Sequence, residues 1–231
     1  MIKVASYNMR KAIGTDRRRN PERILEVLRE IDADVVALQE ADRRFGPRSA
    51  AIPLHLLDLH SGYKPVPLDV HIESMGWHGN AILVRKSVEI LRHEILHIPY
   101  LEPRGAVMAE LELGGHRLRT FGMHLDLSGL WRRKQAAAVI SYALNPHEAM
   151  PTILMGDLNE WSAKGGCLRD FAHHFRFADC GKSFHTRRPV ARLDRIMHCG
   201  GWMVNASGVH DSPAARKASD HLPIWAVLEP A

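Results

Sequence analysis

The sequence of 231 residues predicts an α/β fold, and three stretches of it indicate this. Residues 2–38 read as strand, helix and strand, which implies a parallel pair of strands joined by a right-handed crossover. Residues 106–123 form a hairpin pattern around two glycines. Residues 152–155 are a short apolar run bounded by Pro151 and Gly156, which is typical of a buried strand. The sequence contains no internal repeat and no linker, so residues 1–231 are expected to form one domain.

The first helix is expected to begin at Pro21. Asn20 supplies a side chain suited to the N-cap, and proline is favoured at the first helical position. Apolar side chains then recur at helical spacing, at Ile24, Val27, Leu28 and Ile31. A helix with one apolar stripe packs that stripe on a sheet.

The strands on either side of this helix are followed by polar residues. Residues 2–7 alternate in polarity, whereas residues 35–38 are a continuous apolar run. Asn8 follows the first strand, and Glu40 closes the second. Because the crossover makes the two strands parallel, both polar residues are expected at the same end of neighbouring or near-neighbouring strands.

The remaining elements follow from the same patterns of periodicity and turn residues. The further expected strands are residues 81–84, 88–98, 106–113, 116–123, 193–197, 202–209 and 222–228. The further expected helices are residues 53–60 and 131–144. The chain from the end of the buried strand to about residue 189 is expected to be rich in loops.

The composition indicates which kind of partner and which cellular compartment to expect. The net charge of +5 and the pI near 9.3 favour an anionic partner, although a merely soluble basic surface explains them too. The three cysteines lack metal-site spacing and fit free thiols in a reducing compartment. The N-terminus enters a strand pattern without a signal peptide, and no apolar run could span a bilayer. We therefore expect a cytoplasmic, monomeric protein without integral membrane association.

Polar residues recur where the expected strands begin or end. They are Asn8, Glu40, Asn80, His124, Asp157, Asn159, Asp194, Asp220 and His221. Each alone has a structural explanation: Glu40 could cap a helix, and His124 could be a satisfied core histidine. Together they offer hard oxygen ligands suited to Mg²⁺ or Mn²⁺. They also place two imidazoles near carboxylates, which suits acid–base chemistry.

The order of these segments resembles the endonuclease/exonuclease/phosphatase superfamily of deoxyribonuclease-like phosphoesterases. The matching segments are residues 6–8 (Ser-Tyr-Asn), 38–40 (Leu-Gln-Glu), 79–80 (Gly-Asn), 123–126 (Met-His-Leu-Asp), 156–159 (Gly-Asp-Leu-Asn), 193–196 (Leu-Asp-Arg-Ile) and 219–221 (Ser-Asp-His). The resemblance implies a four-layer sandwich of two packed mixed β-sheets flanked by helices. It places the active site at one end of that sandwich.

The resemblance also implies a metal site and a water-activating site. Glu40 is expected to be the principal ligand of Mg²⁺ or Mn²⁺. Asn8 would help to hold the metal or the phosphate, and Asp220 would be a further metal contact. Asp157 and Asn159 would contact the nucleophilic water and the phosphoryl oxygens.

The same resemblance assigns the imidazoles and the phosphate contacts. His221 would pair with Asp194, which fixes its tautomer and raises its basicity. His124 would be the second imidazole of the site. Asn80 and Arg104 would contact the phosphate.

A competing motif lies at residues 93–97, which read His-Glu-Ile-Leu-His. This pattern matches the zinc-peptidase signature, which requires a helix so that both histidines share one face. Pro99 leaves no room for that helix to continue, so a zinc peptidase is a remote alternative. A non-catalytic nucleic-acid binder is a further alternative, but every expected acid and imidazole is present.

The substrate expected from these patterns is a phosphodiester, and nucleic acid is slightly favoured over phospholipid head groups. The basic residues 17–19 and 132–134 could follow a nucleic-acid backbone, although such clusters are more often solvated faces. The apolar residues 52–59 and 127–131 could instead touch a lipid, as in a sphingomyelinase- or cardiolipin-type phosphodiesterase, or be buried helix faces. An inositol-phosphate phosphatase is the third alternative.

Overall fold

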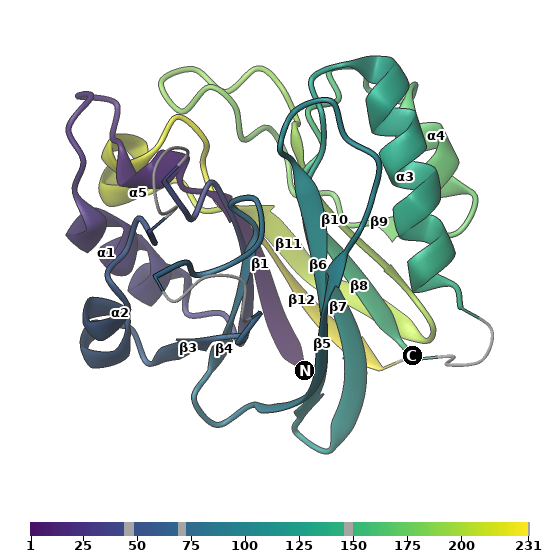
Figure 1. Cartoon of the computed structure of the whole chain (residues 1–231), viewed down its shortest axis with the longest axis horizontal. Coiled ribbons are helices and arrows are strands. Elements are labelled where there is room, and N and C mark those ends of the chain that lie inside the picture. The colour runs from purple at the N-terminus through teal and green to yellow at the C-terminus, as the bar shows by residue number, and fades with distance from the viewer. Residues whose placement is uncertain (44–48, 69–72, 146–149, 231) are drawn as a thin grey trace.

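The computed structural model describes residues 1–43, 49–68, 73–145 and 150–230. Within these residues, two six-stranded mixed sheets pack face to face, and helices cover their outer faces (Figure 1). The expected four-layer sandwich is therefore confirmed.

The first sheet contains the N-terminal strand near its centre. Its strands, in spatial order, are β11 (Trp202–Val209), β12 (Ile224–Pro230), β1 (Ile2–Asn8), β2 (Val35–Gln39), β4 (Ala81–Arg85) and β3 (Tyr63–Pro65). β1 and β2 are parallel, as the crossover predicts, and Asn8 lies opposite Gln39.

The second sheet has the same arrangement of a parallel pair between antiparallel neighbours. Its strands, in spatial order, are β5 (Glu89–Leu96), β6 (Gly105–Leu113), β7 (His116–His124), β8 (Thr152–Asp157), β10 (Asp194–Cys199) and β9 (Arg176–Phe177). β7 and β8 are parallel, and His124 lies opposite Asp157.

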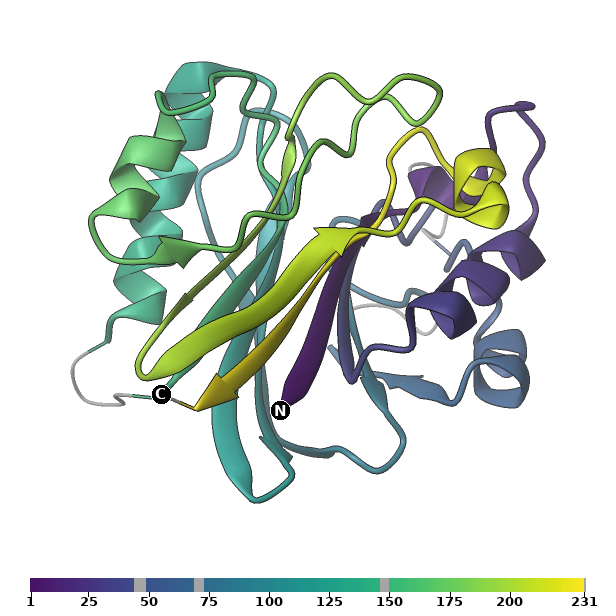
Figure 2. The same ribbon diagram turned by 180° about the vertical axis from the view of Figure 1, so that it is seen from behind.

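The helices form the two outer layers (Figures 1 and 2). The first sheet is covered by α1 (Pro21–Ile31), α2 (Leu54–His60) and α5 (Pro213–Ala218), with the short 3₁₀ helix η1 (Arg10–Ala12) after β1. The second sheet is covered by α3 (Gly129–Ala143) and α4 (Cys167–Ala172). Asn20 caps α1 as expected, since its Oδ1 accepts the Arg23 backbone N–H at 3.2 Å.

A buried apolar layer joins the inner faces of the two sheets. Val4 and Ile82 of the first sheet pack in one cluster with Ile153 and Ile196 of the second. All four side chains are fully buried. Burial of apolar surface is the main stabilising contribution here, so this layer fixes the position of one sheet against the other.

The two parallel pairs explain where the polar residues gather. Parallel strands end at the same edge of a sheet, so each pair delivers two strand-end residues to one place. Asn8 ends β1, and Asp157 ends β8 in the opposite sheet. The Asn8 Nδ2 atom donates a hydrogen bond to Asp157 Oδ2 at 3.0 Å, so the two edges meet at one end of the sandwich.

Short elements are where the sequence prediction is incomplete. α4 and β9 lie within the stretch expected to be loop-rich, and α5 and β3 were not expected either. Each spans six residues or fewer, which is too short for hydrophobic periodicity to distinguish it from a loop.

The state of the cysteines agrees with the expectation from composition. Cys167, Cys180 and Cys199 are all free thiols. No helix in the described ranges is long and apolar enough to cross a bilayer.

Candidate active site

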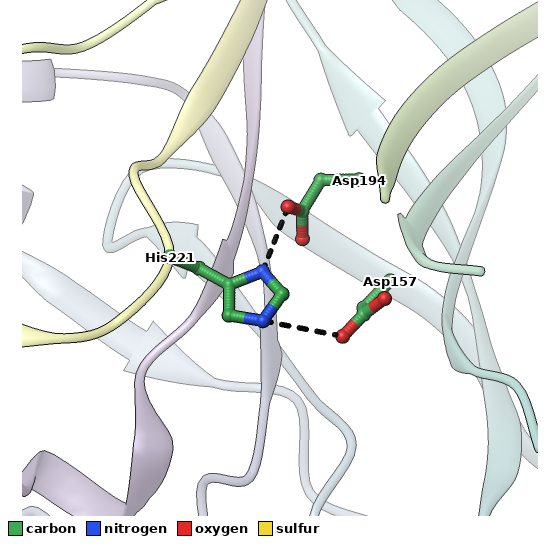
Figure 3. Close-up of side chains that lie close together, drawn as sticks. All are labelled: Asp157, Asp194 and His221. Atoms are coloured by element: carbon green, nitrogen blue, oxygen red, sulfur yellow. Dashed lines mark hydrogen bonds and ion pairs between the residues drawn. The ribbon is translucent and has the colours of Figure 1, made fainter. Parts of the chain in front are cut away.

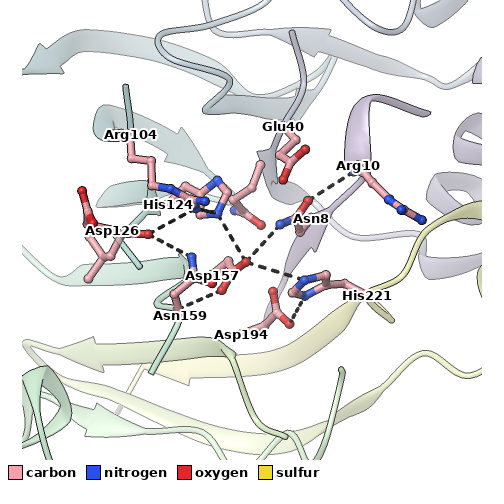
Figure 4. Close-up of polar contacts among 12 residues, drawn as sticks. Asn8, Arg10, Glu40, Arg104, His124, Asp126, Asp157, Asn159, Asp194 and His221 are labelled. Carbon is pink, nitrogen blue, oxygen red and sulfur yellow. Dashed lines mark hydrogen bonds and ion pairs between the residues drawn. The ribbon is translucent and has the colours of Figure 1, made fainter. Parts of the chain in front are cut away.

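Asp157 lies at the centre of a buried polar cluster where the two sheets meet (Figure 4). Its side chain is almost fully buried, with 1% of the residue exposed. Besides Asn8, its Oδ2 atom faces two imidazoles: His124 Nε2 at 3.4 Å and His221 Nε2 at 3.7 Å. Burial opposes ionisation of Asp157, but the neighbouring His221 and His124 hold its pKa well below the usual range.

The local backbone explains how β8 presents this carboxylate. Asp157 Oδ1 accepts the Asn159 backbone N–H at 2.9 Å, and Asn159 Nδ2 donates to the Leu125 carbonyl at 2.9 Å. Gly156 precedes the carboxylate because a Cβ there would lie 2.0 Å from the Met123 carbonyl oxygen of β7. The Gly-Asp-Leu-Asn segment therefore fits against the neighbouring strand and turns directly into the site.

His221 and Asp194 form the expected pair (Figure 3). His221 Nδ1 lies 2.9 Å from Asp194 Oδ2, and the Ser183 hydroxyl donates to the same carboxylate oxygen at 2.5 Å. Asp194 lies directly opposite Asp157 in the antiparallel β8–β10 pair. Burial disfavours the imidazolium, but Asp194 and Asp157 outweigh it and raise the pKa of His221 to about 10.

Glu40 lies on the side of the cluster that opens to a cleft. It follows β2 in a left-handed backbone conformation, with φ 54°, and strain of this kind is often found at functional sites. Its carboxylate forms an ion pair with the Lys11 ammonium group. Burial favours the neutral acid, but the nearby His124, Lys11 and Arg104 outweigh it and lower the pKa of Glu40. Glu40, Lys11, Arg104 and His124 all line the cleft.

Asp220 lies beside the end of β1. Its Oδ2 atom is 3.3 Å from Arg10 Nε, and the Ser219 hydroxyl donates to the Asn8 carbonyl at 2.7 Å. The loop before β12 is thereby attached to β1. This attachment brings Asp220 and the adjacent His221 to the strand-end cluster.

Arg104 reaches the cluster from the loop before β6. Its Nη1 atom contacts His124 Nε2 and donates to the Leu125 carbonyl at 3.3 Å. Asp126 holds this loop in place, since its Oδ2 atom accepts the backbone N–H groups of Leu101 and Glu102 at 3.2 and 3.1 Å. The Arg104 side chain, predicted to contact the phosphate, therefore lies beside His124 and lines the cleft.

Asn80 differs from the other expected residues. Its side chain is fully buried, and its Nδ2 atom donates to the Trp77 carbonyl at 3.3 Å. Its Oδ1 atom has no hydrogen-bond partner among the described residues. The adjacent Gly79 lines the cleft, but no hydrogen bond joins the Asn80 side chain to the Asp157 cluster in the described part of the chain.

Three oxygen donors from the ends of β1 and β2 and the loop before β12 fit a hard divalent cation. Glu40, Asn8 and Asp220 all offer oxygen atoms, which Mg²⁺ and Mn²⁺ prefer. The Lys11 ammonium group already lies against Glu40, so this carboxylate faces a position that attracts positive charge. Asp157, Asp194 and His221 also offer three atoms within 4.8 Å of one another. There, however, the His221 Nδ1 atom is already hydrogen-bonded to Asp194.

An aromatic wall beside His221 was not foreseen. The Phe184 ring lies 4.8 Å from the His221 ring, and Trp161 lies edge-on to Phe184 at 5.8 Å. Trp161 is 64% exposed. Trp161 could have been found from the sequence, because it directly follows the polar segment Asp157–Glu160. No feature of the sequence points to Phe184.

The zinc-peptidase motif is not on a helix. His93 lies within strand β5, and His97 follows the end of that strand. Residues four apart in a strand are separated by about 13 Å, too far to share one metal ion. This alternative is therefore wrong.

The two basic clusters differ in their surroundings. Residues 17–19 are exposed in the loop before α1. Arg132 is instead buried, with its Nη2 atom 3.2 Å from Glu160 Oε2 and its Nη1 atom donating to the Leu127 carbonyl at 2.6 Å. Arg132 thus joins α3 to the loop after β8, and its proposed contact with a nucleic-acid backbone is not supported.

Some of the apolar side chains near the site are buried, and others are exposed. Within residues 52–59, Ile52 and Leu57 are fully buried. Leu127 and Leu130 are 57% and 65% exposed, and Leu101 in the neighbouring loop is 63% exposed. Burial in a helix face therefore does not explain these three leucines.

Known proteins are similar to this chain over almost its whole length. Residues 5–221 match the Endonuclease/Exonuclease/phosphatase family. The chain is 26% identical over 260 residues to the uncharacterized protein YbhP of Escherichia coli K12, covering 98% of this chain and 96% of that protein.

Solved structures share the fold at low sequence identity. The mannosyl-6-phosphatase of Bacteroides thetaiotaomicron has a TM-score of 0.76 and 20% identity, with 99% of this chain and 100% of that chain covered. TDP2 of D. rerio, complexed with a single-strand DNA product, has a TM-score of 0.73 and 18% identity, with 99% and 98% covered.

Proposed function

Because the chain belongs to the endonuclease/exonuclease/phosphatase family, we propose that it is a divalent-metal-dependent phosphodiesterase that acts on nucleic acid. The observation that carries this proposal is the position of Asp157. Its buried carboxylate faces two imidazoles and the Asn8 amide at the point where both sheets end. Such a cluster can orient water on one side and stabilise an anionic phosphoryl group on the other.

The metal is assigned to the side of the cluster on which Glu40 lies. Glu40, with Asn8 and Asp220, would hold Mg²⁺ or Mn²⁺ by oxygen atoms. When bound, the ion supplies positive charge that offsets the negative charge of the phosphoryl group.

The nucleophilic water is assigned to the buried side of the cluster, next to Asp157. Asp157 stays ionised because its imidazole neighbours lower its pKa, so Oδ2 can accept a hydrogen bond from a water molecule and orient it. The Asn159 backbone N–H donates to Asp157 Oδ1 and holds the carboxylate in this orientation. These two residues therefore fix the line of attack on phosphorus.

His221 is assigned to stabilising the charge that develops on the phosphoryl oxygens. Asp194 holds its Nδ1 atom, which leaves Nε2 directed toward Asp157. The raised pKa of His221 keeps the ring protonated at neutral pH. His124 and Arg104 extend the same positive surface toward the cleft.

Two features support nucleic acid as the substrate. The chain carries a net charge of +5, which favours a polyanion. The exposed Trp161 and the adjacent Phe184 offer a stacking surface next to His221. Base–aromatic stacking contributes about 1–3 kcal/mol per base and does not depend on the identity of the base.

A second candidate is a phospholipid phosphodiesterase. It is favoured by one observation, the exposure of Leu101 and Leu127 in loops next to the site and of Leu130 in the first turn of α3. Exposed apolar side chains near a catalytic cleft suit contact with a lipid surface. Inositol phosphates are the third candidate substrate, and the cytoplasmic location and monomeric state stay predictions from the sequence.

One panel of substrates tests these assignments. It contains plasmid DNA, abasic duplex, RNA, sphingomyelin and cardiolipin vesicles, and inositol polyphosphates, each with Mg²⁺ and with Mn²⁺. We expect cleavage of nucleic acid that weakens steeply with added salt, because released counterions oppose binding. Cleavage of vesicles alone would transfer the assignment to phospholipids, and phosphate release from monoesters alone would exclude a diesterase.

A further inference from the structure

A cavity lies behind the active site, on the opposite face of β10. Its volume is about 420 Å³, within the range of about 300–1,000 Å³ that small-molecule sites occupy. Residues of α4, β9 and the segment that leads into β10 line it. These elements lie at the edge of the second sheet (Figures 1 and 2).

The alternation of side chains along β10 separates this cavity from the substrate site. The Asp194 carboxylate points to His221, and successive residues of a strand point to opposite faces. Met197 accordingly packs with Phe171 of α4 on the outer face. Arg195 has the same parity as Met197, so its side chain also lies on the outer face, where it lines the cavity.

Arg195 is a buried cation whose charge is disfavoured by burial and favoured by the nearby Asp194. Only 9% of the residue is exposed, and its Nη1 atom donates to the Asp194 carbonyl at 3.0 Å. No ion pair joins its guanidinium group to a carboxylate in the described part of the chain. A buried charge outside an ion pair is costly, so a group of this kind indicates a position for an anion.

The rest of the lining combines positive charge with apolar surface. Lys164 and Arg169 lie at the cavity and are exposed, whereas the Arg192 charge is paired with Asp179 at 2.6 Å. Leu168 of α4 lines the apolar part, together with Ala172, Phe177 and Ala178. The cavity therefore has a cationic part at Arg195 and an apolar part beneath α4.

We propose that this cavity is a second binding site, which takes a small phosphate monoester with an apolar body. The phosphate would lie on Arg195, because the planar guanidinium fork matches phosphate oxygens. The apolar body would lie along Leu168 and Phe177. The proposal does not rest on the proposed phosphodiesterase function: Asp194 contributes to the lining of this cavity, but neither the metal donors nor the imidazoles do.

The test is calorimetric titration of the full chain with hexyl phosphate and, separately, with inorganic phosphate, both in EDTA at low salt. Arg195→Met keeps the length of the side chain but removes its charge. We expect it to weaken hexyl phosphate binding about tenfold or more, the loss of a charge-assisted hydrogen bond. Arg176→Met is the matched control, because Arg176 is exposed on β9 and does not line the cavity. It should bind like the natural chain.

Ala172→Trp gives an independent measurement. Ala172 is exposed at the end of α4, so a large side chain there should fill the cavity without disturbing the core. It should also abolish binding of hexyl phosphate. Equal affinity of the natural chain, Arg195→Met and Ala172→Trp for hexyl phosphate would overturn the proposal. Equal affinity of the natural chain for inorganic and hexyl phosphate would contradict the assignment of an apolar ligand body to Leu168 and Phe177.

Discussion

His221 Nδ1 lies 2.9 Å from Asp194 Oδ2, although the two residues are 27 positions apart in the chain. Asp194 begins β10 in the second sheet, whereas His221 lies in the loop that leads into β12 of the first. The pair therefore exists only when both sheets are packed. Its carboxylate also accepts the Ser183 hydroxyl, which fixes its orientation toward the imidazole.

His221→Ala and Asp194→Ala should each lower kcat for bis(p-nitrophenyl) phosphate about 10²–10³-fold, the usual cost of removing a donor that stabilises charge developing in the transition state. The double variant should lose little more than either single one, because groups that act as a unit are non-additive. Steady-state kinetics of the three variants measure this. Losses that multiply would show that the two residues act separately.

The sequence predicts this pair only through the order of its motifs. The segments 193–196 and 219–221 each contain a recognisable residue, but no local pattern places them side by side. The β1–α1–β2 unit is different, because its periodicity and its cap are local signals that the structure confirms. Contacts that depend on how two sheets pack are not encoded in any single segment.

Trp161→Ala should raise KM for single-stranded DNA about fivefold or more, since it removes a stacking surface that contributes about 1–3 kcal/mol per base. Its activity on bis(p-nitrophenyl) phosphate should fall less than its activity on DNA, because this small substrate has no successive bases to stack on the indole. Tyr142→Ala is the matched control, an exposed aromatic on α3. Equal KM values for DNA in both variants would remove the aromatic wall from the substrate site.

Arg132→Met should lower the free energy of unfolding by about 3–5 kcal/mol, because it leaves the buried Glu160 carboxylate without its partner. The side chains of this pair are 11% and 8% exposed. Arg133→Met is the control: its side chain is 62% exposed in the pair with Asp170, and exposed pairs contribute about 1 kcal/mol or less. Urea unfolding compares them, and equal effects would contradict the structural role of Arg132.

Arg132 also shows a limit of sequence analysis. It stands in a run of three basic residues, and such a run predicts one solvated face. Adjacent residues of a helix point in different directions, so Arg132 is buried against Glu160 while Arg133 is exposed. Whether a charge is buried depends on the partner that tertiary structure supplies.

Gly156→Ala should lower the free energy of unfolding by about 1–3 kcal/mol, the usual cost of forcing extra atoms into a packed core. A Cβ there would lie 2.0 Å from the Met123 carbonyl oxygen, so β7 and β8 would have to separate. Gly129→Ala is the control at the start of α3, where the nearest atom would be 3.5 Å away. Urea denaturation should find that variant as stable as the natural chain or slightly more stable, and a similar loss in both would contradict the packing argument.

The most direct test of the central claim is the rate of bis(p-nitrophenyl) phosphate hydrolysis with Mg²⁺, with Mn²⁺ and in EDTA, for the natural chain and for Glu40→Gln. The natural chain should be active with either ion and inactive in EDTA. Glu40→Gln should keep its fold but lose most activity, about 10²-fold or more, because it removes the negative charge expected to hold the ion. Glu22→Gln, an exposed position on α1, should match the natural chain. Full activity in EDTA, or in Glu40→Gln, would contradict a metal-dependent phosphodiesterase.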